Sequence, residues 1–121
     1  MQLVADVAVA LVALLHAYFL VLEMFLWDKP TGLRTFGHTA EHAAASKVLA
    51  ANQGLYNGFL AAGLVWSLVA PDPIAWPVRV FFLSCVVVAG LYGGATAARS
   101  ILVFQAVPGL LALVATVLPR F

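Results

Sequence analysis

Residues 3–27 read LVADVAVALVALLHAYFLVLEMFLW, an almost uniformly apolar run in which Asp6 and Glu23 are the charged side chains. At 1.5 Å per residue, a helix of this length crosses the roughly 30 Å hydrocarbon core of a bilayer. The run lacks the basic residues that open a secretory signal peptide, and it exceeds the roughly 7–15 apolar residues of such a peptide. We therefore expect a retained transmembrane helix that ends before Asp28.

The composition of the whole chain also indicates a membrane protein. Hydrophobic residues make up 64% of the 121 residues and charged residues make up 9%, whereas soluble domains are about 45–50% apolar and about 25% charged. A water-soluble fold of this size would leave roughly 40% of its surface exposed, so it could not hide this much apolar surface. The net charge of +1 and the lack of a Lys/Arg cluster exclude nucleic acid as a partner. The lipid bilayer is the partner that this composition predicts.

Three more apolar segments are long enough to cross a bilayer. Pro71 closes the second segment and Pro119 the fourth, and Pro77 opens the third, where its missing N–H does no harm. We predict an all-α fold, an integral membrane four-helix bundle that forms a single transmembrane domain over residues 1–121. The predicted spans are about 3–27, 48–69, 77–98 and 100–118.

The polar loop, residues 28–47, separates the first two spans. Residues 28–32 are typical of a turn. Thr39 is a predicted N-cap, with Glu41 in the first turn, for a helix that begins near Ala40 and continues into the second span. The loop therefore predicts an interfacial helical segment between spans one and two.

The basic residues predict the orientation, because Lys and Arg gather in cytoplasmic loops. Those of the first and third loops are Lys29, Arg34, Lys47 and Arg99, and those of the opposite side are Arg79 and Arg120. We therefore expect a multi-pass protein of the cell membrane, or of the inner membrane in a bacterium, with both termini outside the cytoplasm.

Small residues form a stripe on span two and another on span three. Helices in a bilayer associate through close packing at such residues, because lipid competes for contact with large apolar side chains. We expect these two spans to be the closest pair, or one of the stripes to serve a homo-oligomer. The stripes are Gly54, Gly58 and Ala62 in span two and Ala89, Gly93 and Ala97 in span three.

Polar side chains of the four predicted spans lie at one depth, in the half of the membrane next to loops one and three. Glu23 is four residues before Trp27, about 6 Å along the helix. The other members of this layer are Asn52, Gln53, Tyr56, Asn57, Tyr92 and Gln105. Polar groups in hydrocarbon are costly unless they are paired or wetted, so we predict a polar ligand-binding cavity around Glu23. His16, two helical turns before Glu23, faces the same way and joins the predicted set.

Plainer interpretations of these two residues stay open. Glu23 could be a structural tie that joins spans one and two through amides and Arg99. His16 could be a packed histidine that bonds to a backbone carbonyl or to a tyrosine.

His38, Glu41 and His42 match the H-x-x-E-H string of a class of zinc proteases. Two histidines four residues apart can share one helical face. Such a site needs a third protein ligand downstream, and the next acid, Asp72, is predicted on the opposite side of the membrane. We therefore predict no metal site, and the sequence indicates no particular cofactor.

The string NQGLYNG at residues 52–58 resembles that of a known family of small membrane proteins, the domain-of-unknown-function 1304 family. Further segments that carry the resemblance are 15–19, 22–27, 49–61 and 89–93, together with Gln105. The resemblance extends over essentially the whole chain. It implies a four-helix membrane protein and carries no established activity. The residues that belong to the family pattern are those of the polar layer, whereas His38 and His42 do not belong to it.

Three functions are compatible with this pattern. The first is binding or transport of a small, partly apolar compound, with Glu23 exchanging a proton for that lipophilic ligand. The second is a membrane-embedded acid–base enzyme that acts on a lipophilic substrate, with Glu23 or a tyrosine as the proton donor. The third is a non-catalytic membrane subunit whose polar residues serve assembly. The sequence does not decide whether the protein is an enzyme.

Overall fold

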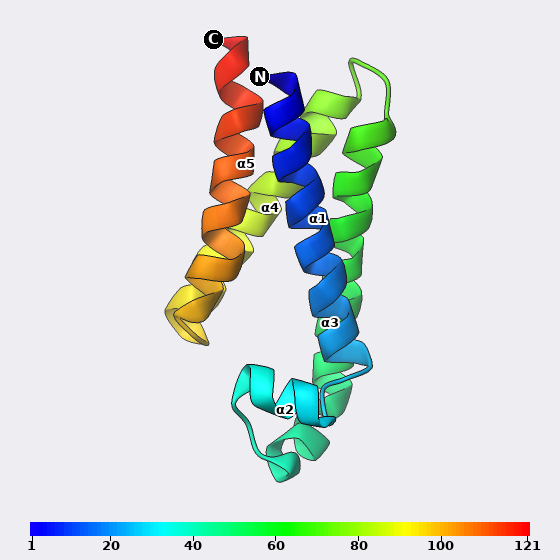
Figure 1. Ribbon diagram of the computed structural model, residues 1–121, viewed down its shortest axis with the longest axis vertical. Helices are drawn as coiled ribbons and strands as arrows, with labels where there is room; N and C mark the ends of the chain where they lie inside the picture. The colour runs from blue at the N-terminus through cyan, green and yellow to red at the C-terminus, as the bar shows by residue number, and fades with distance from the viewer. The chain divides into compact units, whose positions relative to one another are not determined.

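The structure, a computed structural model, describes all residues from Met1 to Phe121 and contains only helices (Figure 1). The five α-helices are α1 (Gln2–Met24), α2 (Pro30–Phe36), α3 (Ala40–Val69), α4 (Ala75–Thr96) and α5 (Val107–Val117). A π-helical segment, Leu102–Ala106, leads into α5, and a 3-10 turn, Leu118–Arg120, follows it. The all-α prediction is confirmed, as is a short helical segment, α2, between α1 and α3.

Three helical stretches are long and apolar enough to cross a membrane: Gln2–Met24, Ala75–Thr96 and Leu102–Arg120. The chain is therefore a multi-pass membrane protein by the length and composition of its helices. Helix α3 is longer, at 30 residues, but it is less apolar because it carries the amides of Asn52 and Gln53 as well as a polar first third. Its role as the second crossing stays a prediction.

The chain forms two compact units, and the boundary between them falls within α1 and within α3. Unit 1 contains Met1–Leu14 and Leu60–Phe121, and unit 2 contains Leu15–Phe59. The single transmembrane domain predicted from the sequence stays a prediction.

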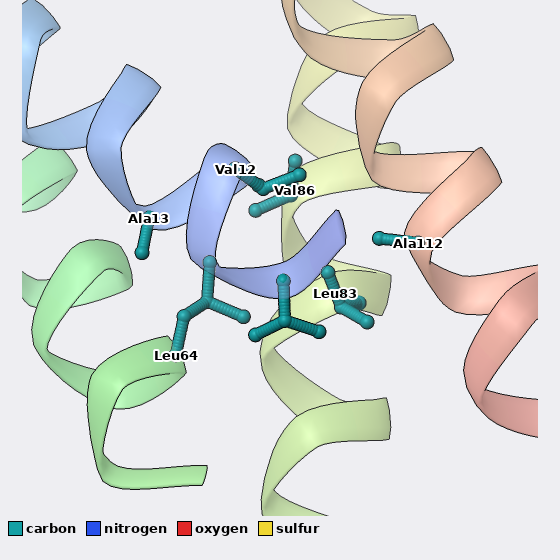
Figure 2. Packing of buried hydrophobic residues seen from close by; sticks show 7 residues of the cluster. Val12, Ala13, Leu64, Leu83, Val86 and Ala112 are labelled. Atoms are coloured by element: carbon teal, nitrogen blue, oxygen red, sulfur yellow. The ribbon is translucent and has the colours of Figure 1, made fainter. Parts of the chain in front are cut away.

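Unit 1 has a core to which four helices contribute. Val9, from α1, and Leu64, from α3, are fully buried together with Leu83 of α4 and Ala112 of α5. Figure 2 shows Val12 and Val86 in the same cluster, with Ala13 beside Leu64. Lipid is as apolar as these side chains, so the cluster stabilises the unit through close van der Waals contact rather than through escape from water.

A widened turn precedes α5. The N–H of Val107 bonds to the carbonyl of Leu102, five residues back. Pro108 has no N–H to offer to Phe104, and its ring would clash with that carbonyl in a regular helix, so a local π-turn relieves the conflict. The turn packs closely on α4 at Gly90. A Cβ added to Gly90 would lie only 2.5 Å from the backbone nitrogen of Ala106.

At its two glycines the small-residue stripe of α3 packs against α1, where we expected span three. A Cβ at Gly54 would lie 2.7 Å from Met24 Cγ, and one at Gly58 would lie 2.6 Å from Leu20 Cδ1. Gly54 and Gly58 thus receive large side chains of α1, one turn apart, whereas Ala62, the third member of the stripe, is exposed. On α4, Gly93 faces Ile101 instead. Spacing alone identifies a groove but does not identify the side chains that fill it.

The segment between α1 and α3 is more helical than predicted. We expected a turn at residues 28–32, but α2 begins at Pro30, since proline is tolerated in a first turn. Gly37 ends α2 in the left-handed conformation, φ 65°, which glycine adopts without strain. Thr39 then caps α3, because its Oγ1 accepts from the N–H of His42 at 3.1 Å. The predicted N-cap and the start of α3 at Ala40 are confirmed.

The contact of α4 with the π-turn gives a first prediction. Gly90→Ala should lower the free energy of unfolding by about 1–3 kcal/mol, the usual cost of overpacking, because the new methyl meets rigid backbone. Gly93→Ala is the matched control, since its methyl would lie 3.1 Å from the side chain of Ile101, which can move. Thermal unfolding in detergent micelles measures both, and equal losses of stability would contradict the contact.

Candidate functional site

The Glu23–Asn57 pair joins α1 to α3 within unit 2. Asn57 is buried, and its Nδ2 donates a hydrogen bond to Glu23 Oε1 at 2.5 Å. Gly54, one turn before Asn57, makes the approach close enough, since a Cβ there would lie 3.0 Å from the Cβ of Glu23. Glu23 itself is half-buried. The structure thus brings together the predicted central acid and one of the four predicted amides.

His16 is fully buried in unit 2. Its ring packs edge-on against Phe19, with 5.5 Å between ring centroids. The side chain is therefore engaged by its own surroundings, and its membership of a ligand site stays a prediction.

Of the other predicted site residues, three belong to unit 2 and two belong to unit 1. Asn52, Gln53 and Tyr56 are exposed on α3, and the ring of Tyr56 contacts Phe59. Tyr92 and Gln105 belong to unit 1, where Tyr92 is 72% exposed and Gln105 is half-buried in the π-turn. Their part in a binding site stays a prediction.

An aromatic cluster around Trp27 lies in unit 2 between the end of α1 and the start of α3. The Trp27 ring lies 4.7 Å from that of Phe36 and 4.4 Å from that of His38, centroid to centroid. Its Nε1 donates to Ser46 Oγ at 3.1 Å. Trp and Tyr prefer the headgroup level of a membrane, so this cluster is typical of an interfacial segment.

The histidines of the H-x-x-E-H string belong to this cluster. His38 and His42 have ring centroids 5.5 Å apart, and His38 Nε2 lies 3.2 Å from the backbone carbonyl of Trp27. Glu41 is exposed on the first turn of α3. No group of three or more His, Cys, Asp or Glu side chains is placed to hold a metal ion.

An exposed ion pair joins the two ends of the same segment, Asp28 and Lys47. Lys47 Nζ donates to Asp28 Oδ2 at 2.9 Å. This hydrogen bond from Lys47, aided by the Lys47 charge, lowers the pKa of Asp28 below its usual value. Any stability that the pair contributes is therefore present above the ordinary pKa of an aspartate and is lost as the pH falls through the lowered pKa of Asp28.

A second charged centre, which the sequence analysis missed, lies in unit 1. Arg79 is buried, its Nη1 lies 2.8 Å from Asp6 Oδ1, and its Nη2 donates to the carbonyl of Ser67 at 3.3 Å. A signal for this pair was available, because Asp6 and Arg79 each lie four residues into a membrane-length helix. Alternate spans of an up-and-down bundle run in the same direction, so opposite charges at this spacing lie at one depth.

The Asp6–Arg79 pair adjoins a cavity of about 190 Å³ at one end of unit 1. Gln2 and Arg120 both line it, so the two ends of the chain meet there. The remaining lining residues are Ala5, Asp72, Ala75, Trp76, Arg79, Ala115, Thr116 and Pro119. The sequence analysis placed a cavity at Glu23 and none at this end.

Comparison with known proteins places these residues in a family. Residues 10–117 match the family described as protein of unknown function (DUF1304). The chain belongs to the DUF1304 family. The matched range includes Glu23, Asn57 and Arg79, whereas Asp6 and Arg120 lie outside it.

A relative of this DUF1304 protein is the uncharacterized protein YpaA of Lactococcus lactis subsp. lactis (strain IL1403). The two chains are 33% identical over 108 residues, which cover 88% of this chain and 90% of YpaA. No solved structure matches the chain. The sequence resemblance to the family is therefore confirmed, and it brings no activity with it.

The Asp28–Lys47 pair gives the second prediction. In Lys47→Met, the titration midpoint of the Asp28 carboxyl should rise toward the ordinary aspartate pKa, because the hydrogen bond that favours the carboxylate is gone. Lys29→Met should raise it less, since the Lys29 charge is the weakest of the influences that lower the pKa of Asp28. Carbon-13 NMR of the Asp28 carboxyl measures both midpoints. A larger rise in Lys29→Met would contradict the pair.

Proposed function

We propose that this DUF1304 protein binds a small, partly apolar compound at the carboxyl of Glu23 and exchanges it for a proton. The observation that carries the proposal is the Asn57–Glu23 hydrogen bond between α3 and α1. A carboxyl within a transmembrane helix is costly and is generally retained for function.

The geometry of the pair supports a role in binding. Asn57 holds Oε1 of Glu23, which leaves Oε2 for a proton or for a donor group of the compound. The neighbouring side chains Met24 and Leu20 pack onto Gly54 and Gly58, so the surroundings of the carboxyl are apolar. An apolar body with one cationic or hydrogen-bonding group is the compound that such surroundings favour.

The proton exchange follows from competition for the same oxygen. A cationic compound binds the carboxylate form of Glu23, and a proton converts that form into a neutral acid with no charge to attract the cation. Affinity should therefore fall as the pH falls, and binding should release protons.

The third prediction tests this with tetraphenylphosphonium, a lipophilic cation, as the probe. The purified protein in detergent should bind the probe more weakly at lower pH, and calorimetry in buffers of different ionisation enthalpy should record proton release. Glu23→Gln should weaken binding by about tenfold or more, in keeping with the loss of a charge-assisted contact, and should abolish the pH dependence.

Glu41→Gln is the matched control for this experiment. It removes an exposed carboxyl from the first turn of α3 and should leave affinity and pH dependence unchanged. If Glu23→Gln binds the probe as the unaltered protein does, with the same pH dependence, the proposed function is wrong.

We further propose that α3 is the second of four crossings and that both termini lie outside the cytoplasm. At 30 residues the helix is about 45 Å long, which exceeds the roughly 30 Å of a bilayer core. The excess of Lys and Arg in the first and third loops supports this orientation.

Reporter fusions give the fourth prediction. Fusions of alkaline phosphatase, which is active outside the cytoplasm, should be active at Asp72 and at the C-terminus, and inactive at Gly37 and Arg99. Fluorescent-protein fusions at the same four positions should give the opposite pattern. The same result at Gly37 and Asp72 would contradict a crossing by α3.

A further inference from the structure

The cavity of unit 1 has the charge pattern of a binding site rather than of a packing defect. Three of the side chains that line it are charged: Asp72, Arg79 and Arg120. Arg79 is neutralised by Asp6, whereas neither Asp72 nor Arg120 has an ion-pair partner. The cavity therefore presents one uncompensated positive charge and one uncompensated negative charge.

The buried arginine carries unused hydrogen-bonding capacity at the same place. Arg79 is only 6% exposed, and its Nε has no hydrogen-bond partner. A buried donor left unpaired costs about 1–3 kcal/mol, and native proteins usually avoid this cost. The Arg79 side chain lines the cavity, and Asp6 and the carbonyl of Ser67 hold its guanidinium in place.

The second arginine is positioned by an aromatic ring. The guanidinium carbon of Arg120 lies 4.9 Å from the centroid of the Trp76 ring, a cation–π distance. Trp76 Nε1 in turn donates to the carbonyl of Thr116 at 3.4 Å. The charge of Arg120 is thus held beside the cavity without being neutralised.

The location of the cavity points to a lipid. Helix α4 begins at Ala75 and the span Leu102–Arg120 ends beside it, so the cavity lies at the membrane–water interface, where headgroups lie. The outer face of the same turns of α1 is apolar and exposed, with Leu3, Val4 and Val7, as expected beside lipid chains.

From these observations we infer that unit 1 binds a phospholipid whose headgroup joins a phosphodiester to a primary ammonium group. Arg120 and Arg79 bind the phosphodiester, for which the planar guanidinium is well suited. Asp72 accepts hydrogen bonds from the ammonium. The pairing of both charges distinguishes this lipid from an anionic one, which would leave Asp72 facing a negative group.

The fifth prediction is tested by native mass spectrometry of the full chain after delipidation. Phosphatidylethanolamine and phosphatidylglycerol with identical acyl chains are titrated in parallel, and glycerophosphoethanolamine supplies the same headgroup without acyl chains. We expect phosphatidylethanolamine to bind more tightly than either by about tenfold, the effect of one charge-assisted hydrogen bond.

Two variants then separate the roles of the two charges. Asp72→Asn should weaken phosphatidylethanolamine, strengthen phosphatidylglycerol and so remove the preference. Arg120→Gln should weaken both lipids by about tenfold. Both positions are exposed, Asp72 in the turn before α4 and Arg120 in the 3-10 turn after α5, so the fold should tolerate the changes. Asp28→Asn and Arg34→Gln alter the same kinds of charge in unit 2 and should leave both affinities unchanged.

Four outcomes would overturn the inference. Equal binding of the two lipids by the unaltered protein would reject the ammonium-bearing headgroup. Equal binding of glycerophosphoethanolamine and the lipid would reject a lipid as the occupant. An unchanged preference in Asp72→Asn, or an equal loss in the unit 2 controls, would place the lipid elsewhere on the protein.

Discussion

Arg79 lies four residues into α4, and there its guanidinium is largely removed from water. Removing an unpaired charge from water is costly, so α4 must lie where Asp6 of α1 can reach it, 2.8 Å away. The pair sets the register of these helices in unit 1. Val9 follows Asp6 by one turn and Leu83 follows Arg79 by one turn, and both are fully buried in the same core. The charged contact and the apolar core are thus successive levels of one helix–helix interface.

The positions of the helices were largely predictable because hydropathy and end signals are local properties of the chain. The apolar runs, the N-cap at Thr39 and the start of α3 needed no knowledge of neighbours. The π-turn was predictable only in part. Pro108 indicated that the helical hydrogen bond to the carbonyl of Phe104 would be missing, but the formation of a widened turn depends on the close packing of Gly90 against it.

The partners of polar side chains were harder to predict, since depth along a helix does not specify direction around it. Glu23 and Asn57 share a depth and do meet, whereas Asn52 and Gln53 share nearly the same depth and face outward. Arg79 was counted only as a loop charge. Its long side chain is compatible with the interface as well as with a buried pair, and the structure is needed to distinguish the two.

The widened turn at Leu102–Ala106 also determines which side of α5 meets its neighbours. Because each residue turns an α-helix by about 100°, one extra residue in a turn rotates all that follows by roughly that angle. With the rotation, the small side chains Gly109, Ala112 and Thr116 face inward, while the bulky Leu111 faces outward. The π-turn therefore determines which face of α5 is turned toward the rest of unit 1. It lets a helix with a single polar side chain, Thr116, and so no polar face to orient it, present its narrowest side to α4.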